Sequence, residues 1–538
     1  MKVLGISGSP RQGGNTDILV QTALGVLDEQ GIQTEFLSLA DRPIKPCMAC
    51  LGCAKADGLR CVQEDPAFEG MNEMCKTLVL LTLVLAGATL HAGEKSFPGT
   101  LQPVVEVEEE VYRFEPANNG AGPTWCSGST CLVRVGEGVL ASGLETLKNA
   151  RPLNNCRWTL YQRTAEGWQL QQADPAGRTR EPCPLAVLPG GKVLLSANPT
   201  IAGPNAYSGP ARPEIVQFSA ADPKADGQTV LPIWDGQPQF SEHSYRSFAA
   251  DGQAGSLVLF QNIGYTHAEW VFRDGSGQWA AKGKLVWPWG AEYDRPQPIR
   301  VCYPDVAVRG RAVHFCGVSD IVEPYQKWRE YKRKLTGNEW DYDFRRLFYA
   351  WTDDITTGKF QPWVEIASRD KTCGWIEPGD LHLTADGAVH VLWTERAIDE
   401  RLRKEFFPAE KQSHTLQYAV LRAGKVVSRQ ALVKAVEGGP AEVPGRGRFL
   451  VLPDGRLLAF YYVHGTDAAG KAVSENRLME LRADGTSGPE VRVPLKHPMR
   501  EYFTASIRAG CSPSMFIDIL GHRAGGTNAM CYARVRLR

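Results

Sequence analysis

From residue 95 to its end, the chain repeats one pattern of apolar and polar positions: an apolar strand, a glycine-containing turn and a second apolar strand. The seven turn glycines are Gly138, Gly191, Gly252, Gly310, Gly387, Gly455 and Gly510. After most of these hairpins comes a second strand pair, such as WTLYQRTAEGWQL or TLQYAVLRAGKVVSRQAL. Two hairpins build a four-stranded blade, so the pattern predicts a mainly β chain with a seven-bladed β-propeller over residues 95–538.

The two ends of the repeat predict how the ring closes. The seventh unit ends in AMCYARVRL, a third strand with no fourth, and residues 104–114 (VVEVEEEVYRF) form an orphan strand at the other end. Pairing the two would remove an exposed edge, which favours a closed ring over a sandwich. Two charged, aromatic stretches, 323–346 and 397–413, interrupt the repeat. We expect them to be partly helical insertions on a blade face, where such loops can wall a cleft.

The first seventy residues follow a different pattern. Residues 2–7 read as a short apolar strand, and a Gly/Ser-rich loop follows. Helical spacing of apolar residues then runs to Leu27, Gly31 closes the helix, and residues 34–39 read as a second strand. This order predicts the first half of a parallel α/β unit. Its loop would place backbone N–H groups and hydroxyls at a helix N-terminus, where phosphate is favoured, although it has neither the GxGxxG nor the Walker spacing.

Between these two parts lies a run of sixteen uncharged residues, 77–92, preceded by Lys76. About 20 apolar residues span a bilayer, so the run is marginal as a span and fits the apolar region of a secretory signal peptide. A buried core helix is disfavoured because the run is apolar on every face. We therefore predict a signal or anchor segment over 74–93 and an exported propeller. If the segment is an uncleaved anchor, residues 77–92 contact the membrane and residues 1–76 stay cytoplasmic.

Composition narrows the function classes. A chain of 538 residues exceeds one ordinary core, so at least two domains are expected, here residues 1–73 and 95–538 around the joint. Lys and Arg number 60, as do Asp and Glu, so the net charge gives no reason to expect nucleic acid as a partner. The 54 glycines and 35 prolines agree with many short strands.

Four of the fourteen cysteines form a C-x2-C-x2-C-x7-C run: Cys47, Cys50, Cys53 and Cys61. Three thiols at this tight spacing can converge on one metal centre, and the fourth completes the four thiolates of an iron–sulfur cluster. A structural zinc site and a disulfide pair are the alternatives. Cys302 and Cys316 fall nearly opposite each other on one predicted hairpin, where an exported protein could form a disulfide.

The N-terminal motifs resemble a known family. GISGSPRQGGNT followed by IKPCMACLGC and a later cysteine is similar to the start of iron–sulfur flavoproteins of the NADPH-dependent FMN reductase family. The resemblance implies a flavodoxin-like fold, a four-iron cluster on the four cysteines, and FMN phosphate bound by Ser7, Ser9, Arg11, Asn15 and Thr16. It covers only residues 1 to about 73, so the later strands of the sheet are absent. A flavin and iron–sulfur oxidoreductase with the propeller as accessory is therefore an alternative function.

The propeller resembles the BNR-repeat, sialidase-like superfamily of carbohydrate-active proteins, with degenerate turn motifs at Gly167-Trp168 and Gly277-Gln278-Trp279. A narrower resemblance, to seven-bladed polysaccharide lyases that cleave uronate-containing glycans by β-elimination, is carried by His243, His267, Arg300 and Tyr303. It implies that His243 and Tyr303 act as base and acid. Arg300 would neutralise the uronate carboxylate, and His267 would position the sugar.

The residue types suit that chemistry. An arginine fork can offset the charge of a carboxylate, and histidine and tyrosine can exchange a proton at close range. A histidine at a strand end can equally be structural. Hydrolysis instead needs two facing carboxylates, for which Asp305, Asp380 and Glu395 are candidates. Six tryptophans are candidates for stacking on sugars or for packing between blades: Trp125, Trp287, Trp289, Trp340, Trp375 and Trp393. A propeller that binds glycan or protein without catalysis remains a further alternative.

Overall fold

The computed structural model describes residues 2–7, 15–29, 31–38, 101–482, 485–526 and 528–538. The chain divides into two compact units, Met1–Gly99 and Thr100–Arg538, and each is described by itself. Among the described residues, no helix is long and apolar enough to cross a membrane. The predicted signal or anchor segment lies outside these residues, so it and the boundaries drawn around it stay predictions.

The N-terminal unit contains β1 (Lys2–Ser7), α1 (Asn15–Glu29) and β2 (Gln33–Ser38). The two strands are parallel, with Lys2 paired to Gln33 and Ser7 to Ser38. Helix α1 packs directly on β1, because a Cβ atom added at Gly5 would lie 2.6 Å from Cγ1 of Val20. This arrangement confirms the strand, helix and parallel strand predicted from the sequence.

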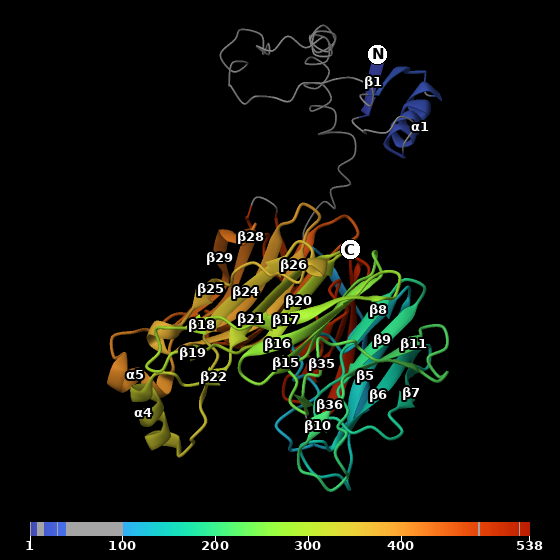
Figure 1. Ribbon diagram of the computed structural model, residues 1–538. Coiled ribbons are helices and arrows are strands. Elements are labelled where there is room, and N and C mark those ends of the chain that lie inside the picture. Colours follow the sequence, from blue (N-terminus) through green and yellow to red (C-terminus); the bar gives the residue numbers. More distant parts are fainter. Residues whose placement is uncertain (1, 8–14, 30, 39–100, 483–484, 527) are drawn as a thin grey trace. The chain divides into compact units, whose positions relative to one another are not determined.

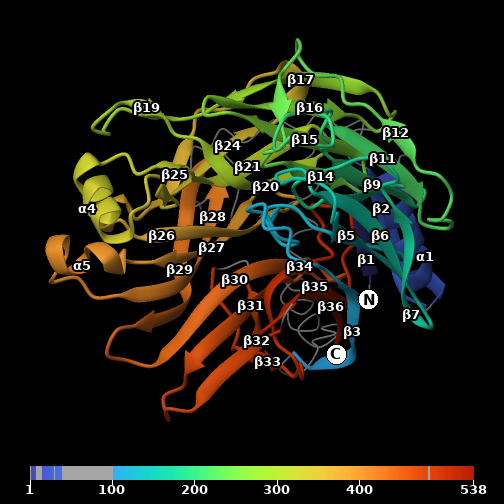
Figure 2. The ribbon, with the colours of Figure 1, turned by 90° about the horizontal axis from the view of Figure 1, so that it is seen from below.

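The second unit is a β-propeller (Figure 1), and in the described part of residues 101–538 seven four-stranded antiparallel sheets follow one another around a central axis (Figure 2). The first blade is β4 (Leu132–Val135), β5 (Gly138–Thr146), β6 (Cys156–Thr164) and β7 (Gly167–Ala173). The second is β8 (Leu185–Leu188), β9 (Lys192–Ala197), β11 (Glu214–Ser219) and β12 (Gln228–Val230). The third is β14 (Ser247–Asp251), β15 (Ser256–Ile263), β16 (His267–Arg273) and β17 (Trp279–Val286).

The remaining blades follow the same plan. The fourth is β20 (Val301–Arg309), β21 (Ala312–Ser319), β24 (Arg346–Thr352) and β25 (Val364–Ser368). The fifth is β26 (Trp375–Leu383), β27 (Val389–Arg396), β28 (Ser413–Arg422) and β29 (Lys425–Val436). The sixth is β30 (Ala441–Val451), β31 (Leu457–Thr466), β32 (Ala472–Leu481) and β33 (Val491–Val493). The seventh is β34 (Met499–Thr504), β35 (Phe516–Arg523), β36 (Ala529–Leu537) and β3 (Pro103–Arg113).

The seventh blade closes the ring with strands from both ends of the propeller. β3 pairs antiparallel with β36 from Pro103 opposite Leu537 to Arg113 opposite Ala529, and Figure 2 shows the C-terminus beside β3. The predicted closure is therefore confirmed. Because the orphan strand pairs with the third strand of the last blade, each of the seven described blades has four strands.

Both predicted insertions contain helices. The first holds α4 (Gln326–Thr336) and the second α5 (Glu400–Phe406), which lie side by side in both ribbon views. The short elements outside the blades are β10 (Pro210–Ala211), β13 (Phe240–Ser241), β18 (Trp289–Gly290), β19 (Gln297–Pro298), β22 (Ile321–Val322), β23 (Tyr342–Asp343), η1 (Ile355–Thr357) and η2 (Asp370–Thr372).

The cysteines of the propeller are buried thiols. All nine, from Cys126 to Cys531, are free and buried. The disulfide suggested between Cys302 and Cys316 is wrong for this structure. A register shift in β20 places Cys302 opposite Val318 and Asp305 opposite Cys316, so the two cysteines are not a facing pair.

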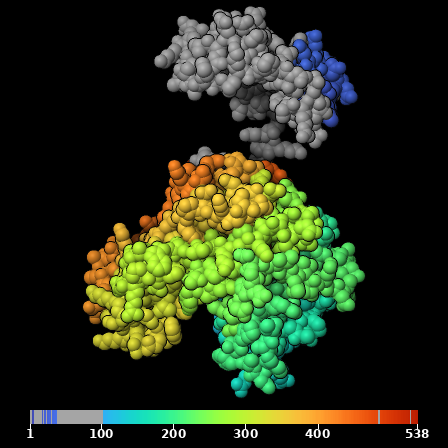
Figure 3. All heavy atoms as spheres, viewed as in Figure 1, coloured from blue at the N-terminus to red at the C-terminus, as the bar shows by residue number. Residues whose placement is uncertain are grey.

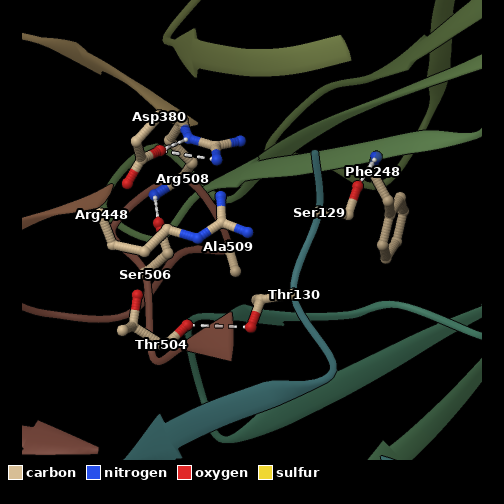
Figure 4. A pocket seen from close by; sticks show the side chains of 9 residues that line it. All are labelled: Ser129, Thr130, Phe248, Asp380, Arg448, Thr504, Ser506, Arg508 and Ala509. Carbon is tan, nitrogen blue, oxygen red and sulfur yellow. Dashed lines mark hydrogen bonds and ion pairs between the residues drawn. The ribbon is translucent and has the colours of Figure 1, made fainter. Parts of the chain in front are cut away.

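The centre of the ring is filled by residues 126–131, which we call the axial segment. It follows the closing strand and passes between the innermost strands (Figure 4). Its hydrogen bonds reach the third, sixth and seventh blades: Ser127 O accepts from Arg448 (2.6 Å), Gly128 O from Arg508 (2.9 Å), Ser129 Oγ from Phe248 N (3.0 Å), and Thr130 Oγ1 donates to Thr504 O (2.8 Å). The segment thus ties blades that are distant in sequence to one another.

A buried ion cluster holds the axial segment in place. Arg508 Nε lies 2.7 Å from Asp380 Oδ1, and Arg508 Nη2 lies 3.0 Å from Asp305 Oδ1. Burial, opposed by the charge of Arg508, raises the pKa of Asp305 to about 7. The hollow beside this cluster holds only about 10 Å³, the space of one water molecule. Asp305 and Asp380, considered above for hydrolysis, are therefore enclosed in the core.

The same cluster predicts a large cost for removing its central cation. Arg508→Met would leave Asp305 and Asp380 buried without their main partner, which costs about 3–5 kcal/mol for a broken buried pair. We expect a loss of this size in the free energy of unfolding, measured on the whole chain by urea and tryptophan fluorescence.

A matched control is Arg311→Met, which removes an ion pair of 3.3 Å to Asp354 in which the arginine side chain is 66% exposed. It should cost less than about 1 kcal/mol. Equal losses for the two variants would contradict a special role for the axial cluster.

Candidate functional site

A pocket of about 540 Å³ opens at the end of the ring where the innermost strands begin. The space-filling view shows this lower edge of the propeller hollowed between the lobe around α4 and the green and teal lobe (Figure 3). The pocket is lined by side chains from the residue before the axial segment, from the fourth to seventh blades and from the β23–β24 loop. The functional side chains among them are Trp125, Tyr303, Phe344, Trp375, Glu377, Arg446, Glu501 and His522.

Backbone irregularities aim several of these side chains into the pocket. The innermost strands of four successive blades each carry a register shift near their start, at Cys302/Asp305, Pro378/Asp380, Pro444/Gly447 and Met499/Glu501. A bulge adds a residue to one strand and redirects its side chain. Tyr303, with a positive φ of 50°, lies inside the first shift, and Arg446 lies inside the third. The pocket residues on these four strands are thus presented by the same kind of deformation, repeated from the fourth blade to the seventh.

One guanidinium and two carboxylates meet in the pocket. Arg446 forms an ion pair with Glu377, and the charge of Glu501 also acts on it. Burial alone would lower the pKa of Arg446, but the carboxylates of Glu377, Asp305 and Glu501 raise it, so this side chain stays charged. Glu501 Oε2 accepts a hydrogen bond of 3.2 Å from Thr124 Oγ1. The site therefore offers hydrogen-bond acceptors and a fixed cation.

Aromatic rings form another part of the pocket wall. The ring centroids of Trp125 and Tyr303 are 5.5 Å apart, those of Tyr303 and Phe344 are 5.8 Å apart, and those of Phe344 and Trp375 are 4.7 Å apart. Burial, reinforced by the charge of Asp320, raises the pKa of Tyr303 well above its ordinary value. Tyr303 consequently carries its phenolic proton at neutral pH and can act as a donor.

The structure places His243 next to this wall, behind Trp125. Their ring centroids are 5.3 Å apart. Nδ1 of His243 lies 2.8 Å from Nη1 of Arg180 and 3.3 Å from Oε1 of Glu181. Nδ1 would have to accept a hydrogen bond from Arg180 but donate one to Glu181. The contact with Arg180 is the shorter, and a guanidinium can only donate, so Nδ1 is the acceptor. Accepting at Nδ1 requires the tautomer that carries its proton on Nε2.

Arg300 is used inside the fold. Its Nη2 lies 3.0 Å from Oδ2 of Asp320 and its Nε donates to the Asp320 carbonyl at 2.9 Å. The residue is only 5% exposed. Its charge is thus balanced by Asp320, and Arg300 is not among the residues that line the pocket in the described part of the chain.

His267 begins β16 and is held by its neighbours. Its Nε2 lies 3.1 Å from Oε1 of Glu269, and its Nδ1 lies 2.8 Å from Oγ1 of Thr266. Of the four residues predicted for the lyase site, the structure therefore brings Tyr303 into the pocket and His243 beside it. Arg300 and His267 have separate partners.

Glu395, the third carboxylate considered for hydrolysis, is also structural. It is buried, and its oxygens accept hydrogen bonds of 2.7 Å from Trp393, Arg369 and Arg429. The carboxylates that do reach the pocket, Glu377 and Glu501, were not predicted. A signal for them exists in the sequence: like Tyr303 and Arg446, each lies on an innermost strand shortly before its turn glycine.

The predicted cofactor residues of the N-terminal unit are only partly covered. Ser7 is the last residue of β1, and Asn15 and Thr16 open α1, so the backbone places them at the two ends of the predicted phosphate loop. Six others lie outside the described residues: Ser9, Arg11, Cys47, Cys50, Cys53 and Cys61. Among the residues that are described, no group of three or more His, Cys, Asp or Glu side chains is arranged to hold a metal ion.

Comparison with known proteins confirms the resemblance of the N-terminus. Residues 1–77 match the family model of NADPH-dependent FMN reductase. An iron–sulfur flavoprotein of Methanocaldococcus jannaschii is 42% identical over 93 residues, which cover 17% of this chain and 45% of that protein. One of Methanosarcina thermophila is 30% identical over 106 residues, covering 20% and 51%. The chain spans about half the length of the curated relatives it matches.

Solved structures similar to the propeller are distant in sequence. An α-L-arabinofuranosidase of Fusarium graminearum has a TM-score of 0.40 and 11% identity, over 80% of this chain and 98% of that one. An α-L-arabinanase of Penicillium chrysogenum has a TM-score of 0.37 and 13% identity, over 80% of this chain and 98% of that one. The apocarotenoid oxygenase of Synechocystis has a TM-score of 0.41 and 10% identity, over 78% of this chain and 97% of that one. Function is therefore argued from the pocket itself.

Proposed function

We propose that the propeller is a carbohydrate-active enzyme and that a glycan is bound and cleaved in the pocket between Trp125 and Trp375. The observation that carries this proposal is the combination of an aromatic wall with a guanidinium and two carboxylates in one pocket of about 540 Å³. Ligand sites typically combine apolar and aromatic walls with a few placed polar groups. A sugar suits both parts, since it offers C–H faces to the rings and hydroxyls to the charges.

Hydrolysis is the reaction that this pocket supports best. Glycoside hydrolysis uses one carboxyl group to protonate the leaving oxygen and another carboxylate to activate water or to attack the sugar. Glu377 and Glu501 are the two carboxylates that reach the pocket, and Arg446 interacts with both. We assign Glu377, which contacts Arg446, the role that needs a carboxylate, and Glu501 the role of proton donor.

β-Elimination of a uronate-containing polysaccharide is the second candidate, because Tyr303 lies in the same pocket as an arginine. Tyr303 holds the proton that would pass to the leaving oxygen. Arg446 would pair with the uronate carboxylate through its fork of donors, a role that the sequence suggested for Arg300. His243 would donate a hydrogen bond from Nε2 to the sugar. A pocket glutamate would remove the proton from the carbon next to the uronate carboxylate.

A redox function of the N-terminal residues is supported by the family match alone. We propose that the loop 7–16 contacts FMN phosphate and that Cys47, Cys50, Cys53 and Cys61 bind an iron–sulfur cluster, as the names of the relatives suggest. Such a chain would act as an NAD(P)H-dependent oxidoreductase. We also propose that segment 77–92 directs export of the propeller, which would bring it to an extracellular or periplasmic polysaccharide.

The hydrolysis proposal predicts the behaviour of two variants. Glu377→Gln and Glu501→Gln should each lower turnover about 10²–10⁴-fold, the usual contribution of one acid or base, measured as reducing ends released from neutral and uronate-rich polysaccharides. Glu339→Gln, an exposed glutamate paired with Arg333, is the control and should keep full turnover. Undiminished activity in both pocket variants would exclude the assignment. Binding without any product would favour a non-catalytic glycan-binding propeller.

The elimination candidate predicts a different product in the same assay. Cleavage of a uronate-rich polysaccharide should create near-ultraviolet absorbance from an unsaturated sugar. Tyr303→Phe should abolish that absorbance while substrate still binds, because the ring stays and only the transferable proton is lost. Arg446→Lys should weaken both binding and rate, since lysine lacks the bidentate fork. If reducing ends appear without this absorbance, elimination is wrong.

The N-terminal proposals meet in one set of measurements. Exported protein should begin near Gly93 on N-terminal sequencing and contain no iron. The unprocessed chain, purified without oxygen, should hold iron and sulfide but bind FMN weakly, because only the phosphate loop of the flavin site is present. Cys50→Ser should remove most of the iron, whereas Cys75→Ser, outside the cysteine run, should keep it. Equal iron in both variants would contradict the cluster assignment.

A further inference from the structure

We propose that Tyr265 and Tyr342 form a second glycan-binding platform next to the pocket, so that the natural substrate is an extended chain of several sugars. The inference rests on the proposed function, because it takes the pocket to be a glycan site. It adds a binding site outside the pocket wall and names the substrate class as oligomeric or polymeric.

The two tyrosines are held by one buried cation. The guanidinium carbon of Arg300 lies 4.2 Å from the ring centroid of Tyr265 and 5.7 Å from that of Tyr342. The two hydroxyl groups are 3.3 Å apart. Arg300 is itself fixed by its ion pair with Asp320. Cation–π contacts of this kind orient aromatic rings, so Arg300 acts as a support beneath the pair.

The ring of Tyr265 is nevertheless open to solvent, while that of Tyr342 is half-buried. Tyr265 is 46% exposed although one of its faces lies over Arg300. An exposed ring that is already fixed loses little conformational entropy when a ligand stacks on it. The arrangement therefore has the properties of a preorganised stacking surface.

The platform is continuous with the pocket. Tyr342 stands two residues before Phe344, which lines the pocket, so their Cα atoms are about 7 Å apart if the chain is extended. The second connection runs through the core. Tyr245 lies 5.2 Å from the Arg300 guanidinium, and its ring centroid lies 5.2 Å from that of Tyr303. A chain of sugars leaving the pocket past Phe344 would meet the platform next.

Polar groups beside the platform suit a carbohydrate. Thr266 directly follows Tyr265, and its hydroxyl lies 2.8 Å from Nδ1 of His267. Glu269 lies 3.1 Å from Nε2 of the same ring. Glu269 is buried and holds the ring from within, so the groups that can meet a sugar hydroxyl here are the exposed Thr266 and the partly exposed imidazole of His267. In this place His267 would position a sugar, the role that the sequence resemblance implied, but outside the pocket.

The test compares long and short ligands. Galacturonate and arabinan oligomers of one to six units are titrated against the whole chain by calorimetry. Tyr265→Ala should weaken binding of the hexamer about tenfold, the order of one lost aromatic contact, and change binding of the dimer by less than twofold. Tyr265→Phe keeps the ring and should retain hexamer affinity. Tyr207→Ala, at a tyrosine 59% exposed on the second blade, is the control and should change neither.

The outcomes separate the platform from the pocket. Equal loss for dimer and hexamer, or no loss for either, would overturn the platform while leaving the pocket as a glycan site. If the unsubstituted protein binds no oligomer in either series, the proposed function fails, and the platform fails with it. An unchanged thermal midpoint in Tyr265→Ala ensures that a loss of affinity is local.

Discussion

The buried ion cluster on the propeller axis is the interaction on which the rest of this structure depends. Seven blades arranged in a ring leave a central hole, and here the hole is filled by charged side chains and the axial segment. Arg508 bridges Asp305 of the fourth blade and Asp380 of the fifth, and it also donates to the carbonyl of Gly128. Because unpaired buried charges are strongly destabilising, the blades can close only in the arrangement that pairs these groups. The cluster thereby fixes the relative positions of the blades.

The pocket and this ion cluster are built from neighbouring positions of the same strands. The innermost strands that supply Asp305 and Asp380 to the cluster also supply Tyr303 and Glu377 to the pocket. Between the two levels, each of these strands carries a register shift. One short stretch of strand therefore supplies two side chains: a carboxylate that pairs with Arg508 in the core and a residue that lines the pocket. Such coupling gives a functional site precise support from the core.

The chain joins this propeller to an N-terminal piece of a different kind. That piece has the parallel strands and helix of an α/β unit and matches a redox family, although the chain spans only about half of the relatives it matches. A fold by itself does not determine activity, so each part needs its own chemical argument. For the propeller the argument comes from side chains in a described pocket. For the N-terminal residues it comes from the spacing of cysteines and from the family match.

The sequence by itself determined the elements whose signal is local. Seven hairpins, the closing strand β3 and the strand–helix–strand start were all predicted, because period-2 and period-3.6 patterns are written in consecutive residues. The outer strands β11 and β12 of the second blade were missed, since β12 has only three residues and lies among polar ones.

Only the tertiary structure decided what the chemically active side chains do. Arg300 was suited by type to bind a carboxylate, but Asp320, twenty residues away, already holds it. Asp305 and Asp380 were candidate catalysts, but Arg508, more than a hundred residues further on, locks them in the core. Glu377, Arg446 and Glu501 belong to three different blades, and their shared position before a turn glycine does not by itself bring them together. Their meeting depends on ring closure and on strand bulges, which are long-range consequences of packing that no stretch of sequence displays.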